Sequence, residues 1–94
     1  MRTVRVVVTG MVQGVGFRAW TEEQALALGL DGWVRNRRDG SVEAIVVGDD
    51  EDVDALRDIL LRGPPGSRVE TVSASDSTEV VGKGFRILPT SAAE

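Results

Sequence analysis

The sequence predicts an α+β fold in which two helices pack on one face of an antiparallel sheet. The expected order is β-α-β-β-α-β with a short strand at the end. Period-two alternation over residues 4–9 and 41–48 predicts strands, and apolar residues at helical spacing over 17–28 and 53–60 predict helices. Ninety-four residues suffice for one domain with one core. We assign residues 1–90 to that domain and 91–94 to a frayed tail.

The chain is expected to begin with a strand, a glycine-rich loop and a helix. Residues 4, 6 and 8 are valines that alternate with other side chains, as in a strand with one buried face. Glycines at positions 10, 14 and 16 then indicate a tight loop that exposes its backbone. A helix follows over residues 17–28. Its buried face is expected to carry Thr21, Ala25 and Leu28, and Gly29 ends it.

A hairpin is predicted next. Residues 30–38 form its first strand, on which Val34 and Asn36 share one face. Asp39-Gly40 is a strong signal for a hairpin turn, and residues 41–48 form the returning strand.

The second helix begins in a run of acids at 49–52, which we expect to cap free backbone amides and to complement the helix dipole. A metal site in this run is the weaker interpretation, because consecutive acids fan around a helix start instead of converging. The buried stripe should consist of Val53, Leu56 and Leu60, and the Gly-Pro-Pro-Gly segment at 63–66 ends the helix.

The chain should close with a strand at 69–73, a polar turn region at 76–82 and a short strand at 83–88 whose Phe85 and Ile87 face inward. The whole order is the split βαβ, or ferredoxin-like, arrangement. That fold carries enzymes, RNA binders and small-molecule sensors, so function must be argued from a site.

Composition excludes several kinds of chemistry. The chain has no His, Cys or Tyr, which excludes imidazole bases, thiol nucleophiles and the usual zinc ligand sets. A net charge of −4 argues against a nucleic-acid partner. There is no apolar run of 18 residues and no signal-like start, so we expect a cytoplasmic protein with no membrane partner, monomeric by default.

The most informative stretch runs from Gly10 to Arg18. Glycines let successive N–H groups point into one concavity, and the helix start adds unpaired amides, which together favour anion binding. Arg18 in the first helical turn is locally unfavourable unless an anion compensates it. A glycine-rich turn with an exposed Arg is the alternative. The stretch lacks the Lys and the following hydroxyl of nucleotide P-loops, and no parallel crossover follows as in dinucleotide-binding folds.

Asn36 is the second candidate. Its amide offers both a donor and an acceptor, so it can hold a water molecule and a phosphoryl oxygen together. The alternative is a strand-end residue bonded to the turn. Spacing alone does not show whether this strand end meets the glycine-rich loop.

Nearly the whole chain resembles the acylphosphatase family. The resemblance is carried by two blocks and two shorter segments: Gly10-x-Val12-Gln13-Gly14-Val15-Gly16-Phe17-Arg18; Leu28-Gly29-Leu30-x-Gly32-Trp33-Val34-Arg35-Asn36-x-x-Asp39-Gly40-x-Val42-Glu43; Gly63-Pro64-Pro65; and Gly84-Phe85-x-Ile87.

The resemblance implies a hydrolase, free of metal and cofactor, that cleaves the carboxyl-phosphate bond of acyl phosphates to a carboxylate and inorganic phosphate. It implies that Arg18 binds the phosphate oxygens and that Asn36 orients the attacking water. The implied phosphate cradle is the run of backbone amides of Gln13, Gly14, Val15, Gly16, Phe17 and Arg18.

Two tryptophans and Arg37 are left without an implied role. Trp20 is interpreted either as a wall for the acyl group or, preferably, as a half-buried helix residue, and Trp33 as packing. Arg37 stands where the family has no fixed residue.

Elementary chemistry agrees with an acyl phosphate substrate. The leaving carboxylate has a conjugate acid of pKa about 4, so no general acid is needed and a chain without His is not handicapped. The rival function is a non-catalytic module. An RNA binder is disfavoured by four aromatics and negative net charge. An anion sensor, or the acylphosphatase-like domain that begins carbamoyl-transferring hydrogenase maturation proteins, stays open. The absence of zinc-finger cysteines favours a free-standing enzyme.

Overall fold

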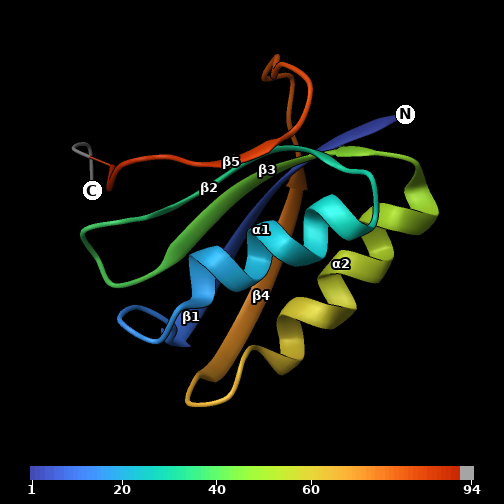
Figure 1. Cartoon of the computed structure of the whole chain (residues 1–94). Helices are drawn as coiled ribbons and strands as arrows, with labels where there is room; N and C mark the ends of the chain where they lie inside the picture. The colour runs from blue at the N-terminus through green and yellow to red at the C-terminus, as the bar shows by residue number, and fades with distance from the viewer. Residues whose placement is uncertain (92–94) are drawn as a thin grey trace.

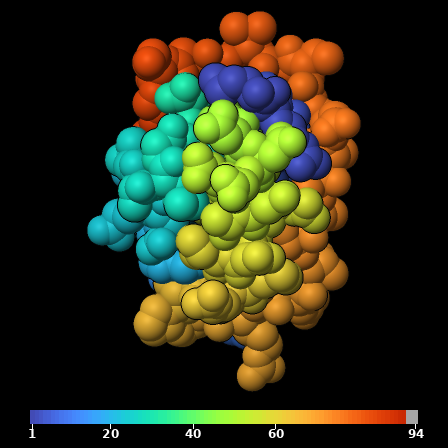
Figure 2. All heavy atoms as spheres, turned by 90° about the vertical axis from the view of Figure 1, so that its right-hand side faces the viewer, coloured from blue at the N-terminus to red at the C-terminus, as the bar shows by residue number. Residues whose placement is uncertain are grey.

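The computed structural model describes residues 1–91. The elements in chain order are β1 (Arg2–Met11), α1 (Phe17–Ala27), β2 (Asp31–Asn36), β3 (Val42–Gly48), α2 (Asp50–Arg62), β4 (Arg68–Asp76) and β5 (Phe85–Ile87). The strands form one sheet in the order β4-β1-β3-β2-β5. Both helices cover the same face of it (Figure 1), and α2 lies between α1 and β4 in the side view (Figure 2). The predicted ferredoxin-like α+β fold is confirmed.

The last strand differs from the expected antiparallel sheet. β1 pairs antiparallel with β3 and β4, and β2 pairs antiparallel with β3, but β5 runs parallel to β2. The connection after β4 determines this direction, because both of its ends are held where β1 and β2 begin. The backbone N–H of Ser77 donates to the Thr3 carbonyl at the start of β1, and the backbone N–H of Gly84 donates to the Asp31 carboxylate at the start of β2. A strand that begins at that end of the sheet must run in the direction of β2.

The core lies between the helices and the inner face of the sheet. The predicted inward valines of β1 are 0–2% exposed, and each fully buried side chain of this size stabilises the fold by about 1.5–3 kcal/mol. The predicted buried stripe of α2, Val53, Leu56 and Leu60, is also confirmed. Buried core residues include Val4, Val6, Val8, Phe17, Ala25, Leu30, Val34, Val42, Val46, Val53, Leu56, Leu60 and Phe85.

The outer face of the sheet is also partly closed. Glu43 on β3 is 1% exposed and forms ion pairs with Arg5 on β1 and Arg35 on β2. The Arg35 guanidinium lies 4.6 Å from the centre of the Trp33 ring. The indole N–H of Trp33 donates to a carboxylate oxygen of Glu79 at 2.8 Å. Trp33 therefore packs on the face opposite Asn36, in agreement with the sequence.

Several details differ from the sequence-based expectations. β4 extends to Asp76, beyond the predicted 69–73, and β5 covers only Phe85–Ile87 of the predicted 83–88. The first strand of the hairpin ends at Asn36, because residues 37–41 are needed for the turn. The side chain of Asp49, the N-cap of α2, makes no capping hydrogen bond, so the acids there complement the dipole by charge. Ile87 is 39% exposed, because it borders an open cleft instead of the core. Ser91, expected in the frayed tail, is buried and donates its N–H to the Asn36 carbonyl; residues 92–94 lie outside the described part.

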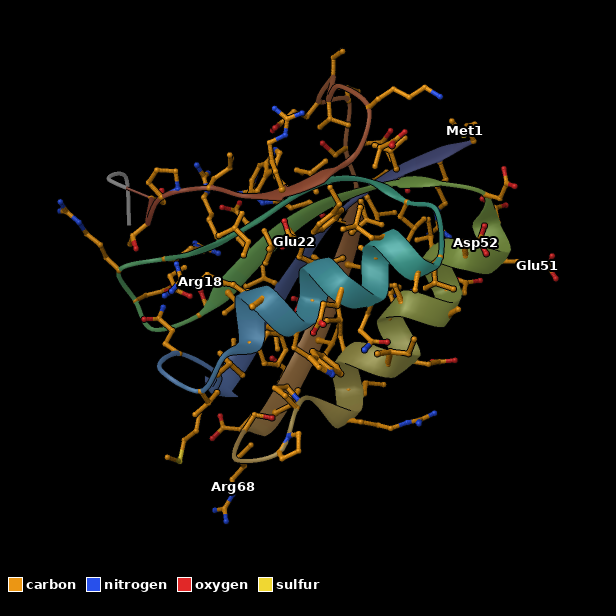
Figure 3. The ribbon with its side chains drawn as sticks, viewed as in Figure 1. Met1, Arg18, Glu22, Glu51, Asp52 and Arg68 are labelled. Carbon is orange, nitrogen blue, oxygen red and sulfur yellow. The ribbon has the colours of Figure 1, made fainter. Side chains whose placement is uncertain are left out.

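The acidic start of α2 holds no converging ligand set. Glu51 and Asp52 project outward from the helix (Figure 3). Within residues 1–91, no three Asp or Glu side chains gather where a metal ion could be held. Over the same residues, neither helix has the length and apolar character that crossing a bilayer requires.

Candidate active site

The loop between β1 and α1 is shaped by left-handed glycines. Gly14 and Gly16 have φ angles of 74° and 77°, a region that costs other residues about 1 kcal/mol or more. A Cβ added at either position would meet no atom within 4 Å, so the backbone conformation, and not lack of space, calls for glycine here. Gly16 is also the N-cap residue of α1, and having no side chain it leaves the helix start open.

The N-terminus of α1 is left electrically uncompensated. It has no side-chain cap and no acidic residue in its first turn, whereas the first turn of α2 carries three acids. The first backbone bond of the helix joins the Trp20 N–H to the Gly16 carbonyl. Over the described residues, none of the N–H groups from 13 to 19 donates a hydrogen bond. These amides and the helix dipole form a positive surface that suits an anion.

Strand order brings this loop beside Asn36. β1 and β2 are both antiparallel to β3, so they run the same way and end at the same edge of the sheet. Val42 on β3 pairs with Val8 on one side and with Asn36 on the other. The loop that follows β1 therefore starts just beyond the end of β2, which sequence spacing did not reveal.

The two candidate side chains share one cleft. It has a volume of about 230 Å³. In Figure 3, the Arg18 side chain projects from the first turn of α1 toward the end of β2. The cleft is lined by Val12, Gly14, Gly16, Phe17, Arg18, Ala19, Asn36 and Ile87.

Both side chains lack partners within residues 1–91. Arg18 makes no ion pair or hydrogen bond there, although Arg5 and Arg35 are both paired with Glu43. The Oδ1 atom of Asn36 is buried and accepts no hydrogen bond. Leaving such an acceptor unpaired costs about 1–3 kcal/mol. The alternative was a strand-end residue bonded to the turn, but within residues 1–91 the Asn36 side chain makes no hydrogen bond to the turn.

Gln13 and Val15 do not line the cleft. Val15 packs against the core as a partly buried side chain. The Gln13 carboxamide points to the β2–β3 hairpin, where Nε2 donates to the Arg37 carbonyl at 2.7 Å and to the Ser41 carbonyl at 2.8 Å. Sequence reasoning assigned Gln13 only a backbone role, and no local pattern signals a contact across 24 and 28 residues.

The neighbouring aromatic residue is structural. Trp20 packs against the core and meets Phe17 edge to face, with ring centres 5.5 Å apart. It is not part of the cleft lining. The preferred interpretation, a half-buried helix residue, is confirmed.

Size alone does not identify the site. A larger hollow of about 400 Å³ lies between α2 and β4, lined by Asp54, Arg57, Asp58, Leu61 and Val72. Asp54 there is already ion-paired with Arg2 and Arg57. Within residues 1–91, this hollow contains no buried acceptor that lacks a partner, so the smaller cleft is the stronger candidate.

The hairpin turn carries one perturbed carboxyl. The Ser41 hydroxyl donates to Asp39 Oδ1 at 2.5 Å and the Ser41 N–H donates to the same atom at 2.9 Å. These two bonds, with a smaller effect of the Arg37 charge, hold the pKa of Asp39 below its ordinary value. Ionised Asp39 thus fixes the turn that follows Asn36.

Asp39→Asn should therefore lower stability in a pH-dependent way. A carboxyl whose pKa is lower folded than unfolded stabilises the fold above the unfolded pKa of about 3.9, and this is lost as pH falls through the folded pKa. We expect the variant to be less stable than wild type at about pH 6, with the gap closing on acidification. Denaturant unfolding from about pH 6 to pH 2.5 measures this, and a gap independent of pH would contradict the charged role.

Comparisons with known proteins show the family of this chain. Residues 4–87 match the family model described as Acylphosphatase. The chain is 54% identical over 86 residues to an acylphosphatase of Rhizorhabdus wittichii, covering 92% of this chain and 87% of that protein. It is 47% identical over 93 residues to one of Bradyrhizobium diazoefficiens, covering 93% and 94%. Its fold matches the crystal structure of acylphosphatase from Bacillus subtilis with a TM-score of 0.88 at 36% identity, covering 94% and 99%. The chain belongs to the acylphosphatase family of enzymes.

Proposed function

We propose that this enzyme hydrolyses acyl phosphates to a carboxylate and inorganic phosphate in the cleft between the β1–α1 loop and the end of β2. The reaction uses backbone amides, Arg18 and Asn36, with no metal ion or cofactor. Residues 1–90 act as one domain, and the protein works as a cytoplasmic monomer. Family membership supports the reaction class, and the geometry of the cleft supports the roles of individual groups.

Phosphate recognition is assigned to the loop and to Arg18. The unpaired N–H groups of residues 13–18 supply donors whose directions the backbone already sets before substrate binds. The Arg18 guanidinium adds a charge and two parallel donors, a geometry that fits phosphoryl oxygens. Together they stabilise the negative charge that the oxygens carry in the transition state.

Water positioning is assigned to Asn36. Its buried Oδ1 is an acceptor, which repels phosphate oxygens but accepts a hydrogen bond from water. A module that only sensed anions would use only the N–H donors of this carboxamide and would have no use for its buried oxygen. This unpaired oxygen beside the anion-binding loop is the observation that favours hydrolysis over simple anion binding.

The remaining chemistry needs little from the protein. The departing carboxylate is a stable anion at neutral pH, so it leaves without a proton donor. The attacking water must lie in line with the bond that breaks, and this placement is the main contribution required of the site. The chain has no His to take the water proton, so we assign that proton to a phosphoryl oxygen of the substrate.

Arg18→Ala and Asn36→Ala should each lower kcat/KM by about 10²-fold or more, because each removes a group that acts on the transition state. Arg18→Ala should also weaken inhibition by inorganic phosphate, whereas Asn36→Ala should leave that inhibition largely intact. Phosphate release from benzoyl phosphate measures both variants.

Arg68→Ala is the matched control for these variants. Arg68 is exposed at the start of β4 and points away from Arg18 (Figure 3). Arg68→Ala should keep the wild-type rate. If Arg18→Ala and Asn36→Ala also kept the wild-type rate, the assignment of the cleft would be wrong.

The wild-type rate should show no ionising enzyme group between about pH 6 and pH 7, because the chain has no side chain that ordinarily titrates there. Values of kcat measured with benzoyl phosphate across this range test the assignment of the proton. An enzyme ionisation in that interval, absent from the substrate's own titration, would refute transfer to a phosphoryl oxygen.

A further inference from the structure

The Gln13 side chain joins the two halves of the cleft. Its amide group has two N–H bonds, and both are used: one to the Arg37 carbonyl at 2.7 Å and one to the Ser41 carbonyl at 2.8 Å. Gln13 itself belongs to the anion-binding loop and precedes Gly14, which lines the cleft. One carboxamide therefore connects the loop after β1 to the hairpin between β2 and β3.

The two acceptors are placed at the end of the strand that carries Asn36. Asn36 pairs with Val42 as the final pair of the β2–β3 ladder. Arg37 and Ser41 come immediately beyond this pair, and the Arg37 N–H donates to the Ser41 carbonyl at 2.9 Å. By bonding both carbonyls, Gln13 holds the turn at the point where Asn36 leaves the ladder.

Asn36 depends on its backbone for its position. Within residues 1–91, its side-chain oxygen has no partner that would orient it. Its backbone carbonyl accepts a hydrogen bond from Ser91, and its neighbour Arg37 is held by Gln13. Any shift of the hairpin relative to the loop would move Asn36 Oδ1 relative to the phosphate site, and a shift of about 1 Å can cost about 10²-fold in rate.

We infer that Gln13 is a positioning residue. Its carboxamide fixes the distance between the phosphate-binding amides and Asn36, and thereby the place where the attacking water lies against the phosphorus. This inference rests on the proposed function, because it acts through the role assigned to Asn36. It separates two tasks within one loop: the backbone binds the anion, and the Gln13 side chain aligns the water site.

The test is a double-variant cycle with Gln13→Met and Asn36→Ala. Methionine keeps the length of glutamine and removes both donors without adding charge beside the phosphate. Gln13→Met should lower kcat by about 10-fold to 100-fold, while the inhibition constant for inorganic phosphate changes by less than about 3-fold, because the amides stay in place. In the Asn36→Ala background, Gln13→Met should cause almost no further loss, because the group it positions is already absent.

Two further variants guard against a purely structural effect. Thr9→Val removes the hydrogen bond between the hydroxyls of Thr9 and Thr71, which are 2.5 Å apart on β1 and β4. It should leave kcat and phosphate inhibition unchanged. Gln13→Asn keeps both donors on a side chain one methylene shorter, and it should show the same selective loss of kcat to a smaller extent. It replaces Gln13→Met in the cycle if the latter does not fold.

The outcomes separate this inference from the proposed function. If Asn36→Ala kept the wild-type rate, the proposed function would fail first. If Asn36→Ala lost activity but the losses of the two variants multiplied, or if Gln13→Met weakened phosphate inhibition as much as kcat, Gln13 would not act through Asn36. The inference would then be overturned while the proposed function stood.

Discussion

The site depends on a helix start that the chain leaves unsatisfied. The N–H groups of residues 13–19 donate to nothing within the described residues, and the first turn of α1 carries a cation where α2 carries acids. The cation near the positive end of the dipole is locally unfavourable, and the amides are donors without a protein partner. A bound anion resolves both at once. The left-handed glycines at 14 and 16 make the arrangement sterically accessible.

Strand pairing brings the other half of the proposed reaction site to this loop. Because β3 lies between β1 and β2 and opposes both, the ends of β1 and β2 meet at one edge of the sheet. The loop brings donors to that edge, and Asn36 brings one buried acceptor. Hydrogen bonds from Gln13, Ser41 and Ser91 hold the surrounding backbone. The cleft is thus formed by tertiary contacts between segments that are distant in the sequence.

Patterns that act over a few neighbouring residues were enough to predict most of the helices and strands. Period-two valines, the helical stripe of α2 and the Asp39-Gly40 turn each act over a few residues, and all three were predicted correctly. Features that depend on distant partners were missed. The direction of β5, the exposure of Ile87 and the burial of Ser91 follow from which strand the last segment joins. The ion pairs of Arg5 and Arg35 with the buried Glu43 also join different strands, and no local pattern signals them. For the site, the glycine spacing predicted the loop and Arg18 as candidates. The role of Asn36 was predicted only from the resemblance, and its position beside the loop follows from the register of the sheet.

The most direct test of the central claim is a titration of the ¹⁵N-labelled protein with inorganic phosphate, followed through its backbone amide resonances. If the open start of α1 is the anion site, the amides of residues 13–19 should shift saturably, and Arg18→Ala should weaken the apparent affinity without moving the effect elsewhere. Saturable shifts confined to α2, or none in the loop at concentrations that inhibit the enzyme, would contradict the account.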